Sequence, residues 1–154
     1  MITETFGNTE LLKLNKIAFL CSRKVSAGAV LKCYDWAINQ RENDNCVISG
    51  FHSQLEKDVL HYLLKGTQPI IIALARGLKR NLEPELIKPF EQGRILIITP
   101  YEKNVTRVTE QTALIRNKMM LDVADQIVIG FASKEGQLTT LLADFTKPIK
   151  YLCL

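Results

Sequence analysis

The sequence predicts one α/β domain with a mostly parallel central sheet, from the form of its apolar runs and the length of the segments between them. Six short runs recur, and most are continuous rather than alternating: KIAFLC from Lys16, CVIS from Cys46, PIIIAL from Pro69, RILIIT from Arg94, QIVIGF from Gln126 and PIKYL from Pro148. Continuous β-branched runs are typical of strands covered on both faces. Most intervening segments can hold a crossover helix, which parallel strands require.

The segments between the runs predict four helices, and SKEGQLTT from Ser133 has the composition of a further helix start. Residues 27–40 and 54–66 carry apolar side chains at helical spacing, and Gly66 is a typical terminator. The third, a short helix, is expected between Pro84 and Gly93. We expect the fourth to start near Asn117 and to run to Asp125, with Ile115, Met119, Met120 and Val123 packing inward.

Composition indicates a globular protein, since 47% of the 154 residues are hydrophobic and 23% are charged. The apolar runs fall far short of the ~20 residues of a membrane span, and the N-terminus lacks the pattern of a signal peptide. We therefore expect a cytoplasmic protein without a membrane segment.

The four cysteines show no C-x-x-C spacing, and only two histidines accompany them, so we predict free thiols and no metal site. No motif requires a cofactor. The net charge of +4 is compatible with an anionic partner such as nucleic acid, without demanding one.

Candidate ligand-binding residues follow the predicted strands, because ligands of parallel α/β sheets bind at the carboxyl ends of the strands. The rim is polar, small and basic: Ser22, Arg23 and Lys24 after the first strand, Ser49, Gly50, His52 and Ser53 after the second, Arg76, Lys79 and Arg80 after the third, and Ser133, Lys134, Gly136, Gln137, Thr139 and Thr140 after the fifth. Each group could bind phosphate or serve as an ordinary turn or helix cap. Ser53 with Glu56 fits a capping box, for example.

The sequence favours a binding protein over an enzyme. A nucleophilic triad needs a base and an orienting carboxylate, and neither Ser49 nor Cys21 has an obvious partner beyond His52. The acidic residues Glu56, Asp58, Glu83 and Glu85 lie at positions expected on helix surfaces or in the first turns of helices. They are therefore weak evidence for a pair of catalytic carboxylates.

Taken together, IAFLCSRKVSAGAV, CVISGFHSQLEKDVLHYLL, ALARGLKRNLEPE, LIRNKMMLDVADQIVIGFASKEGQLTTLL and KPIKYL resemble the DNA-processing protein A family, DprA or Smf. The resemblance implies a Rossmann-like three-layer sandwich over residues 16–154, with residues 1–15 as an N-terminal extension. In that family the first strand ends in G-S-R-x, the second in S-G-x-A-R-G-I-D and the third in G-S-G-L-D. An R-N-R triplet precedes the fifth strand, and S-G-S-L-I-T follows it.

The matching positions are Ser22 and Arg23, Ser49 and Gly50, Gly77 and Leu78, Arg116 and Asn117, and Gly136, Leu138 and Thr140. Cys21 replaces the first-loop glycine, Lys118 the last arginine of the triplet and Gln137 a serine. The arginine of the second loop is missing, and we expect Arg76 to compensate for it. The resemblance makes Arg116 a phosphate contact, Asn117 an organiser of the loop and Lys118 a weaker substitute for a guanidinium.

The resemblance implies binding of single-stranded DNA in a basic groove, with protection of that DNA and help in loading a recombinase during transformation. The chain ends at Leu154, so we expect no winged-helix module and do not carry recombinase loading over. A homodimer is compatible with the family. Phe51, Tyr101 and Phe131 are candidate stacking partners for bases, although core packing explains them equally.

Two alternatives stay open. A nucleotide-binding sensor would use the same rim of cations and backbone amides. A phosphoribohydrolase of the lysine-decarboxylase-like group, which cleaves nucleoside monophosphates, carries P-G-G-x-G-T-x-x-E at the position of GFASKEGQLTT. Here the diglycine is missing and Glu135 precedes Gly136, so the acid expected to assist cleavage is misplaced.

Overall fold

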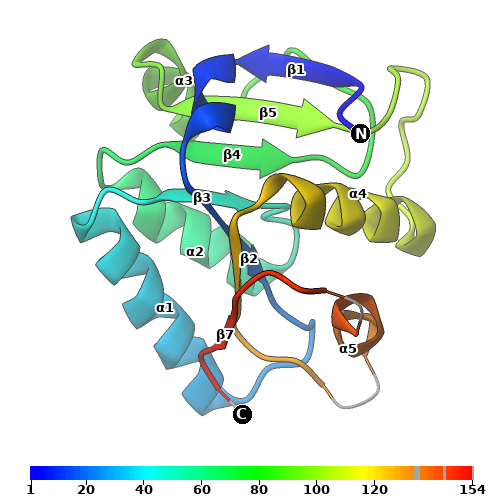
Figure 1. Ribbon diagram of the computed structural model, residues 1–154. Helices are drawn as coiled ribbons and strands as arrows, with labels where there is room; N and C mark the ends of the chain where they lie inside the picture. Colours follow the sequence, from blue (N-terminus) through cyan, green and yellow to red (C-terminus); the bar gives the residue numbers. More distant parts are fainter. Residues whose placement is uncertain (134–135, 144, 154) are drawn as a thin grey trace.

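A seven-stranded sheet forms the centre of the protein (Figure 1). The computed structural model describes residues 1–133, 136–143 and 145–153. The strands are β1 (Glu4–Gly7), β2 (Lys16–Leu20), β3 (Cys46–Ser49), β4 (Ile70–Ala73), β5 (Ile95–Thr99), β6 (Gln126–Ile129) and β7 (Ile149–Tyr151), in the order β1-β5-β4-β3-β2-β6-β7. All neighbours are parallel except β1 and β5. The six predicted strands and the mostly parallel sheet are confirmed.

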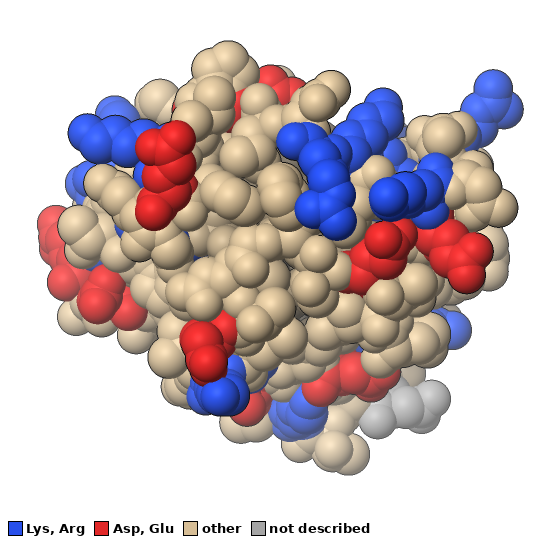
Figure 2. Space-filling view, turned by 90° about the horizontal axis from the view of Figure 1, so that it is seen from above, with Lys and Arg blue, Asp and Glu red and all other residues tan. Residues whose placement is uncertain are grey.

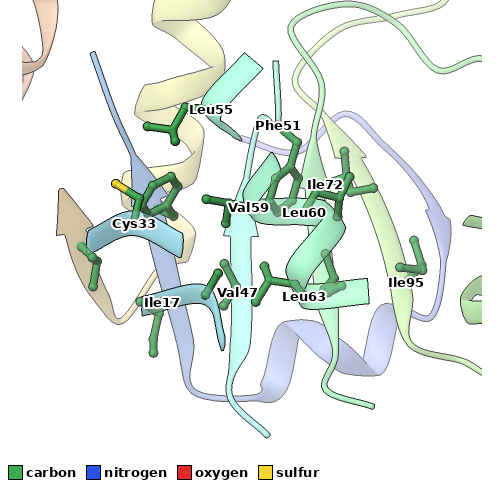
Figure 3. Packing of buried hydrophobic residues seen from close by; sticks show 14 of the residues in the cluster. Ile17, Cys33, Val47, Phe51, Leu55, Val59, Leu60, Leu63, Ile72 and Ile95 are labelled. Carbon is green, nitrogen blue, oxygen red and sulfur yellow. The ribbon is translucent and has the colours of Figure 1, made fainter. Parts of the chain in front are cut away.

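Helices cover both faces of the sheet and make three layers (Figure 1). The helices α1 (Ala27–Glu42), α2 (Gln54–Leu64) and α3 (Pro84–Glu91) lie on one face, whereas the 3₁₀ helix η1 (Thr9–Lys13), α4 (Glu110–Val123) and α5 (Gln137–Leu142) lie on the other. Side chains of β2 alternate between the two cores: Ile17 and Phe19 face the first, Ala18 and Leu20 the second. Figure 3 shows the first core, where Val59, Leu60 and Leu63 of α2 pack on the sheet. The predicted three-layer sandwich is therefore confirmed.

The helix ends follow from local sequence. Ser26 caps α1, Ser53 and Glu56 form a capping box at α2, and Pro84 is the first residue of α3. In the described part of the chain, none of the helices has the length and apolar character needed to cross a membrane.

The prediction that a helix starts near Asn117 was wrong. The helix α4 starts at Glu110, because Thr109 and Thr112 cap its amino end reciprocally. Arg116, Asn117 and Lys118 therefore lie in the middle of α4. Met119 and Met120 are fully buried, as expected.

The first strand was not among the predicted ones. Residues 4–7, within the expected N-terminal extension, pair with β5 in an antiparallel ladder. Its side-chain anchor is Phe6, whose ring centroid lies 4.7 Å from that of Phe90. A short edge strand held mainly by backbone hydrogen bonds leaves little signal in the sequence.

The topology identifies one edge of the sheet as a candidate ligand site. From β2 the chain proceeds through β3 and β4 to β5, and α4 then returns it to β6, on the other side of β2. The loop after β2 leads to α1 on one face, and the loop after β6 leads to α5 on the other. Such a divergence of loops is where open α/β sheets bind ligands.

Candidate functional site

Within the described part of the chain, two adjoining cavities open at the carboxyl ends of the strands. The β2–β6 cavity has a volume of about 400 Å³ and lies between the loops after β2 and β6 and the helices α2 and α4. The β4–α3 cavity, of about 470 Å³, lies between α2, the end of β4 and the segment leading into α3. His52 and Arg116 line both cavities, so the two adjoin at these side chains.

The loops after β2 and β6 are tied to each other. The Ser22 amide donates to the Phe131 carbonyl at 2.8 Å, and the Ser22 hydroxyl accepts a hydrogen bond from the Ser133 amide at 3.0 Å. The Gly136 amide donates to the Ser133 carbonyl at 3.1 Å. These hydrogen bonds hold the loops after β2 and β6 together where they line the β2–β6 cavity. The side chains of Arg23 and Lys24 are exposed beside it.

Arg116 is a buried cation, 7% exposed, that points from α4 to the ends of the strands. Its Nη1 donates to the carbonyl of Ala73, the last residue of β4, at 3.2 Å, and its Nε donates to Asn117 Oδ1 at 2.7 Å. Among the residues that the structure describes, no Asp or Glu forms an ion pair with it. Burial lowers the pKa of Arg116 from its usual value, and the nearby Glu56 carboxylate opposes this shift. A buried cation without an ion-pair partner attracts an anionic ligand.

The guanidinium of Arg116 lies directly against the backbone of Gly50. A Cβ atom at position 50 would overlap it, with Arg116 Cζ at only 2.5 Å. The next residue, Phe51, adopts the left-handed conformation with φ of 46°, which is unusual for a bulky side chain. The glycine that follows β3 therefore makes room for the arginine of α4.

The amino end of α2 is closed by its own side chains. Glu56 Oε1 accepts hydrogen bonds from the amides of His52 and Ser53, both at 3.0 Å, and Ser53 Oγ accepts one from the Glu56 amide at 3.2 Å. The predicted capping box is confirmed, and these amides are already occupied. Desolvation lowers the pKa of His52, and the charge of Arg116 lowers it further.

Arg76 lines the β4–α3 cavity, and the backbone of Arg76 and Gly77 is held by the end of β5 and the loop that follows it. Thr99 Oγ1 donates to the Arg76 carbonyl at 2.5 Å, and the Gly77 amide donates to Val105 O at 2.7 Å. The Arg76 side chain folds back so that Nη1 donates to the Gly77 carbonyl at 2.9 Å. Arg76 thus adds a second guanidinium to the cavity that Arg116 lines. That it compensates for the missing arginine stays a prediction.

Most of the predicted site residues meet at this edge. Those lining the β2–β6 cavity are Ser22, Arg23, Lys24, His52, Ser53, Arg116, Asn117, Ser133, Gly136 and Gln137, and those lining the β4–α3 cavity are Gly50, His52, Arg76, Lys79 and Arg116. The other candidates among the described residues, Ser49, Arg80, Lys118, Thr139 and Thr140, line neither cavity. Ser49 is fully buried and its hydroxyl accepts from the Phe51 amide at 3.4 Å, whereas Lys118 and Thr140 are exposed on α4 and α5.

The three aromatic residues expected as stacking partners differ in where they lie. Phe51 is 6% exposed and belongs to the core, as the packing alternative for this residue predicted. Tyr101 and Phe131 are half-buried and are not part of either cavity wall. The two predictions on Lys134 and Glu135 fall outside the described residues.

Sequence reasoning missed further lining residues. Lys57 and Asn81 enter the β4–α3 cavity, and Glu110 enters the β2–β6 cavity. Glu110 was missed because α4 was expected to begin later, and Lys57 because an exposed helix position carries no distinguishing pattern. The cap formed by Thr109 and Thr112 places Glu110 in the first turn of α4, but Thr112 stands where a capping box usually has Glu or Gln, so the sequence carries no clear signal for it.

The surface charge around this edge is mixed. Figure 2 shows Lys and Arg side chains gathered toward the right of the view, the side on which β4 and β5 end in Figure 1, with Asp and Glu side chains near them. The β4–α3 cavity has the same character, since Lys57, Arg76 and Lys79 line it together with Glu83 and Glu85. The edge therefore offers separate cationic positions rather than one uniformly basic surface.

Solved structures share this fold. DNA processing protein A from Helicobacter pylori superposes with a TM-score of 0.72 at 20% identity, covering 96% of this chain and 69% of that one. DNA processing protein A from Streptococcus pneumoniae gives 0.74 at 16% identity, covering 96% and 53%, so this chain spans about half of its length. The molybdenum cofactor binding protein from Rippkaea orientalis gives 0.60 at 12% identity, covering 90% and 76%.

No curated protein matches the sequence. The family described as DNA recombination-mediator protein A, in contrast, matches residues 4–147, which include β1 and extend past α5. The match takes in the loops after β2, β3, β4 and β6 and the Arg116–Asn117 pair of α4. Because the match covers nearly the whole chain, the protein belongs to the DNA recombination-mediator protein A family.

Proposed function

We propose that the protein binds single-stranded DNA without cleaving it, through phosphates held at the carboxyl edge of the sheet. Family membership gives it a role in DNA processing. The Helicobacter pylori relative of the same fold binds single-stranded DNA. The proposal places backbone phosphates against Arg116 and Arg23, with Lys24 and Arg76 on either side.

The observation that carries the proposal is the position of Arg116. Its guanidinium is buried, has no ion-pair partner among the described residues and borders both cavities. A guanidinium can hold a phosphate with two parallel hydrogen bonds, and burial strengthens such bonds. Nε and Nη1 already donate to Asn117 and Ala73, which fixes the plane of the group and leaves the other donors for a ligand.

Two adjoining cavities favour a polymer over a single nucleotide. A strand that passes Arg116 can place one phosphate in the β2–β6 cavity and its next nucleoside in the β4–α3 cavity. Contacts to phosphate carry no sequence information, so we expect sequence-tolerant and salt-sensitive binding.

Fluorescence anisotropy of a labelled oligothymidine tests the proposal. The wild-type protein should bind at low salt, and Arg23→Ala should weaken binding because an exposed cation beside the β2–β6 cavity is lost. Lys13→Ala is the matched control: it removes the same charge from an exposed side chain in η1, just before the amino end of β2. Absence of binding at low salt, or equal losses in both variants, would contradict the proposal.

A second candidate is a small nucleotide-like ligand held in one cavity. The volume of the β2–β6 cavity, about 400 Å³, falls within the range of small-molecule sites. The Rippkaea orientalis protein, which has a similar fold, binds molybdenum cofactor. Thermal unfolding across a panel of nucleoside monophosphates and cyclic nucleotides would reveal such a ligand through a rise in Tm. Release of free base from a monophosphate would instead indicate a phosphoribohydrolase.

A further inference from the structure

Two of the four free cysteines, Cys21 and Cys33, meet beside the end of β6. Cys21 follows β2, and Cys33 lies in α1. A Cβ atom at Gly130 would lie 3.2 Å from the first sulfur and 2.6 Å from the second. Figure 3 shows Cys33, with its sulfur in yellow, in the core between α1 and the sheet. Both sulfurs therefore lie against one glycine, in the space that a side chain would fill.

The two thiols titrate as a pair. A hydrogen bond with Cys21 lowers the pKa of Cys33, whereas the same bond together with burial raises the pKa of Cys21. The pair therefore forms its first thiolate more readily than an isolated thiol does, and the remaining proton stays between the two sulfurs. A thiolate is the form of cysteine that reacts with oxidants and with disulfides.

The two sulfurs differ in their access to solvent. Cys33 is fully buried and lines neither cavity. Cys21 is half-buried and lines the β2–β6 cavity together with Arg23 and Arg116. A small oxidant that enters this cavity therefore meets Cys21 first, and Cys33 then meets the oxidised Cys21. An accessible cysteine with a second cysteine beside it is the usual arrangement of a reversible redox site.

We propose that Cys21 and Cys33 form a reversible disulfide when the protein meets hydrogen peroxide, and that this disulfide protects the ligand site. First, the Cys21 sulfur attacks one oxygen of the peroxide. The O–O bond breaks, Cys21 becomes a sulfenic acid, and the other oxygen leaves as water. The Cys33 sulfur then attacks the Cys21 sulfur, the S–O bond breaks as the S–S bond forms, and the second oxygen leaves as water. The two thiols thus lose two electrons and two protons to one peroxide.

The disulfide protects the site because of what Cys21 becomes without it. A sulfenic acid without a neighbouring thiol proceeds to sulfinic and sulfonic acids, which are anions at neutral pH and which thiols do not reduce. Such an anion would lie in the cavity that Arg23 and Arg116 line, where it would repel a phosphate. A disulfide is neutral, so the cavity keeps its charge. This protective role rests on the proposed function, whereas formation of the disulfide does not.

Peptide mapping of the native protein after peroxide treatment tests the disulfide without any variant. Trypsin cuts the chain between the two cysteines, so peptides 17–23 and 33–41 stay joined only if Cys21 is bonded to Cys33. We expect the joined peptides after treatment, and their separation after addition of dithiothreitol. A disulfide to another cysteine, or separate peptides in which Cys21 carries added oxygen, would overturn the proposal.

The variant Cys33→Ala tests the protection of the cavity by anisotropy. Untreated, it should bind oligothymidine like the wild type, because Cys33 lines neither cavity. After peroxide we expect Cys21 of the variant to carry two or three added oxygen atoms and its affinity to fall about tenfold, while the wild type keeps its affinity. Cys153→Ala is the matched control, since Cys153 is half-buried, lines neither cavity and should leave the disulfide and the affinity unchanged.

The two measurements fail in different ways. Equal affinities of the wild type and Cys33→Ala after peroxide would overturn the protective role. If neither untreated protein binds oligothymidine, the proposed function fails, and peptide mapping still decides whether the disulfide forms.

Discussion

Gly50 is the residue that allows Arg116 to reach the ends of the strands. A side chain at position 50 would occupy the space of the guanidinium. Gly50→Ala should therefore displace Arg116 and break its hydrogen bond to Ala73. Overpacking of this kind costs about 1–3 kcal/mol, and loss of the phosphate contact should weaken oligothymidine binding about tenfold.

Urea unfolding and anisotropy measure these two effects of Gly50→Ala. The double variant Gly50→Ala, Arg116→Ala tests the cause, because without the guanidinium the added methyl group has room. The stability lost in the double variant should then be smaller than the sum of the losses in the two single variants. Strict additivity would show that Gly50 acts independently of Arg116.

His52 predicts how binding depends on pH. In the free protein, desolvation and then the Arg116 charge lower the pKa of His52, so the side chain is neutral at pH 7. A bound phosphate favours the imidazolium form and raises this pKa. Binding then takes up protons, and affinity for oligothymidine should increase as pH falls from 8 toward 6, by up to about tenfold for each unit of pKa shift.

Anisotropy titrations across this pH range, at constant ionic strength, test the prediction. The variant His52→Gln cannot take up a proton and should show a flat profile. His61→Gln is the control, because His61 lies further along α2 and lines neither cavity. Unchanged pH dependence in His52→Gln would show that another group is responsible.

At the scale of elements, the close packing of α1 against the end of β6 depends on Gly130. A Cβ atom there would lie 2.6 Å from Cys33 Sγ of α1, 3.1 Å from Phe19 Cζ and 3.2 Å from Cys21 Sγ. Gly130→Ala should cost about 1–3 kcal/mol of unfolding free energy.

Gly28, in the first turn of α1, gives the opposite expectation. Nothing lies within 4 Å of a Cβ atom added there, so Gly28→Ala should be neutral or stabilising by up to about 1 kcal/mol.

Chemical denaturation of the two alanine variants decides between packing and backbone effects. If both glycines matter only through backbone entropy, both variants should be stabilised. A stabilised Gly130→Ala would contradict the close approach of α1 to the strand.

The elements differ in how far the sequence predicts them. The runs at Val47 and Ile71 are readable because a strand covered on both faces needs continuous apolar side chains. The start of α4 was not readable, since Thr112 stands where a capping box usually has Glu or Gln. The edge strand around Phe6 depends on backbone pairing to β5, which a single sequence does not reveal.

The candidate site, too, can be predicted only in part from the sequence. The family motifs include Arg23, Gly50 and Arg116, so the sequence alone marks them as candidates. Their roles depend on contacts between distant segments: Arg116 fits only because β3 brings Gly50 beside it. Ser49 carries a motif match, yet its hydroxyl serves the turn after β3 and is fully buried.

For the whole molecule, the cations at the edge predict the salt dependence of binding. Arg23, Lys24, Arg76 and Arg116 line the two cavities. If each neutralises one phosphate of a single strand, the slope of log K against log salt concentration is about −3. Arg23→Ala should reduce the magnitude of this slope by about 0.7, whereas Lys13→Ala should leave it unchanged. Anisotropy between about 50 and 200 mM salt measures it, and a slope near zero would exclude phosphate contacts.

The most direct test of the central claim is to map the bound strand on the protein. Amide chemical shifts of the ¹⁵N-labelled protein, titrated with oligothymidine, report which backbone positions sense the ligand. The account predicts that the largest changes fall at residues 21–24, 50–53, 76–82 and 116–117, at the carboxyl ends of the strands. Changes concentrated around η1 and the amino ends of the strands, with none at Arg116, would contradict it.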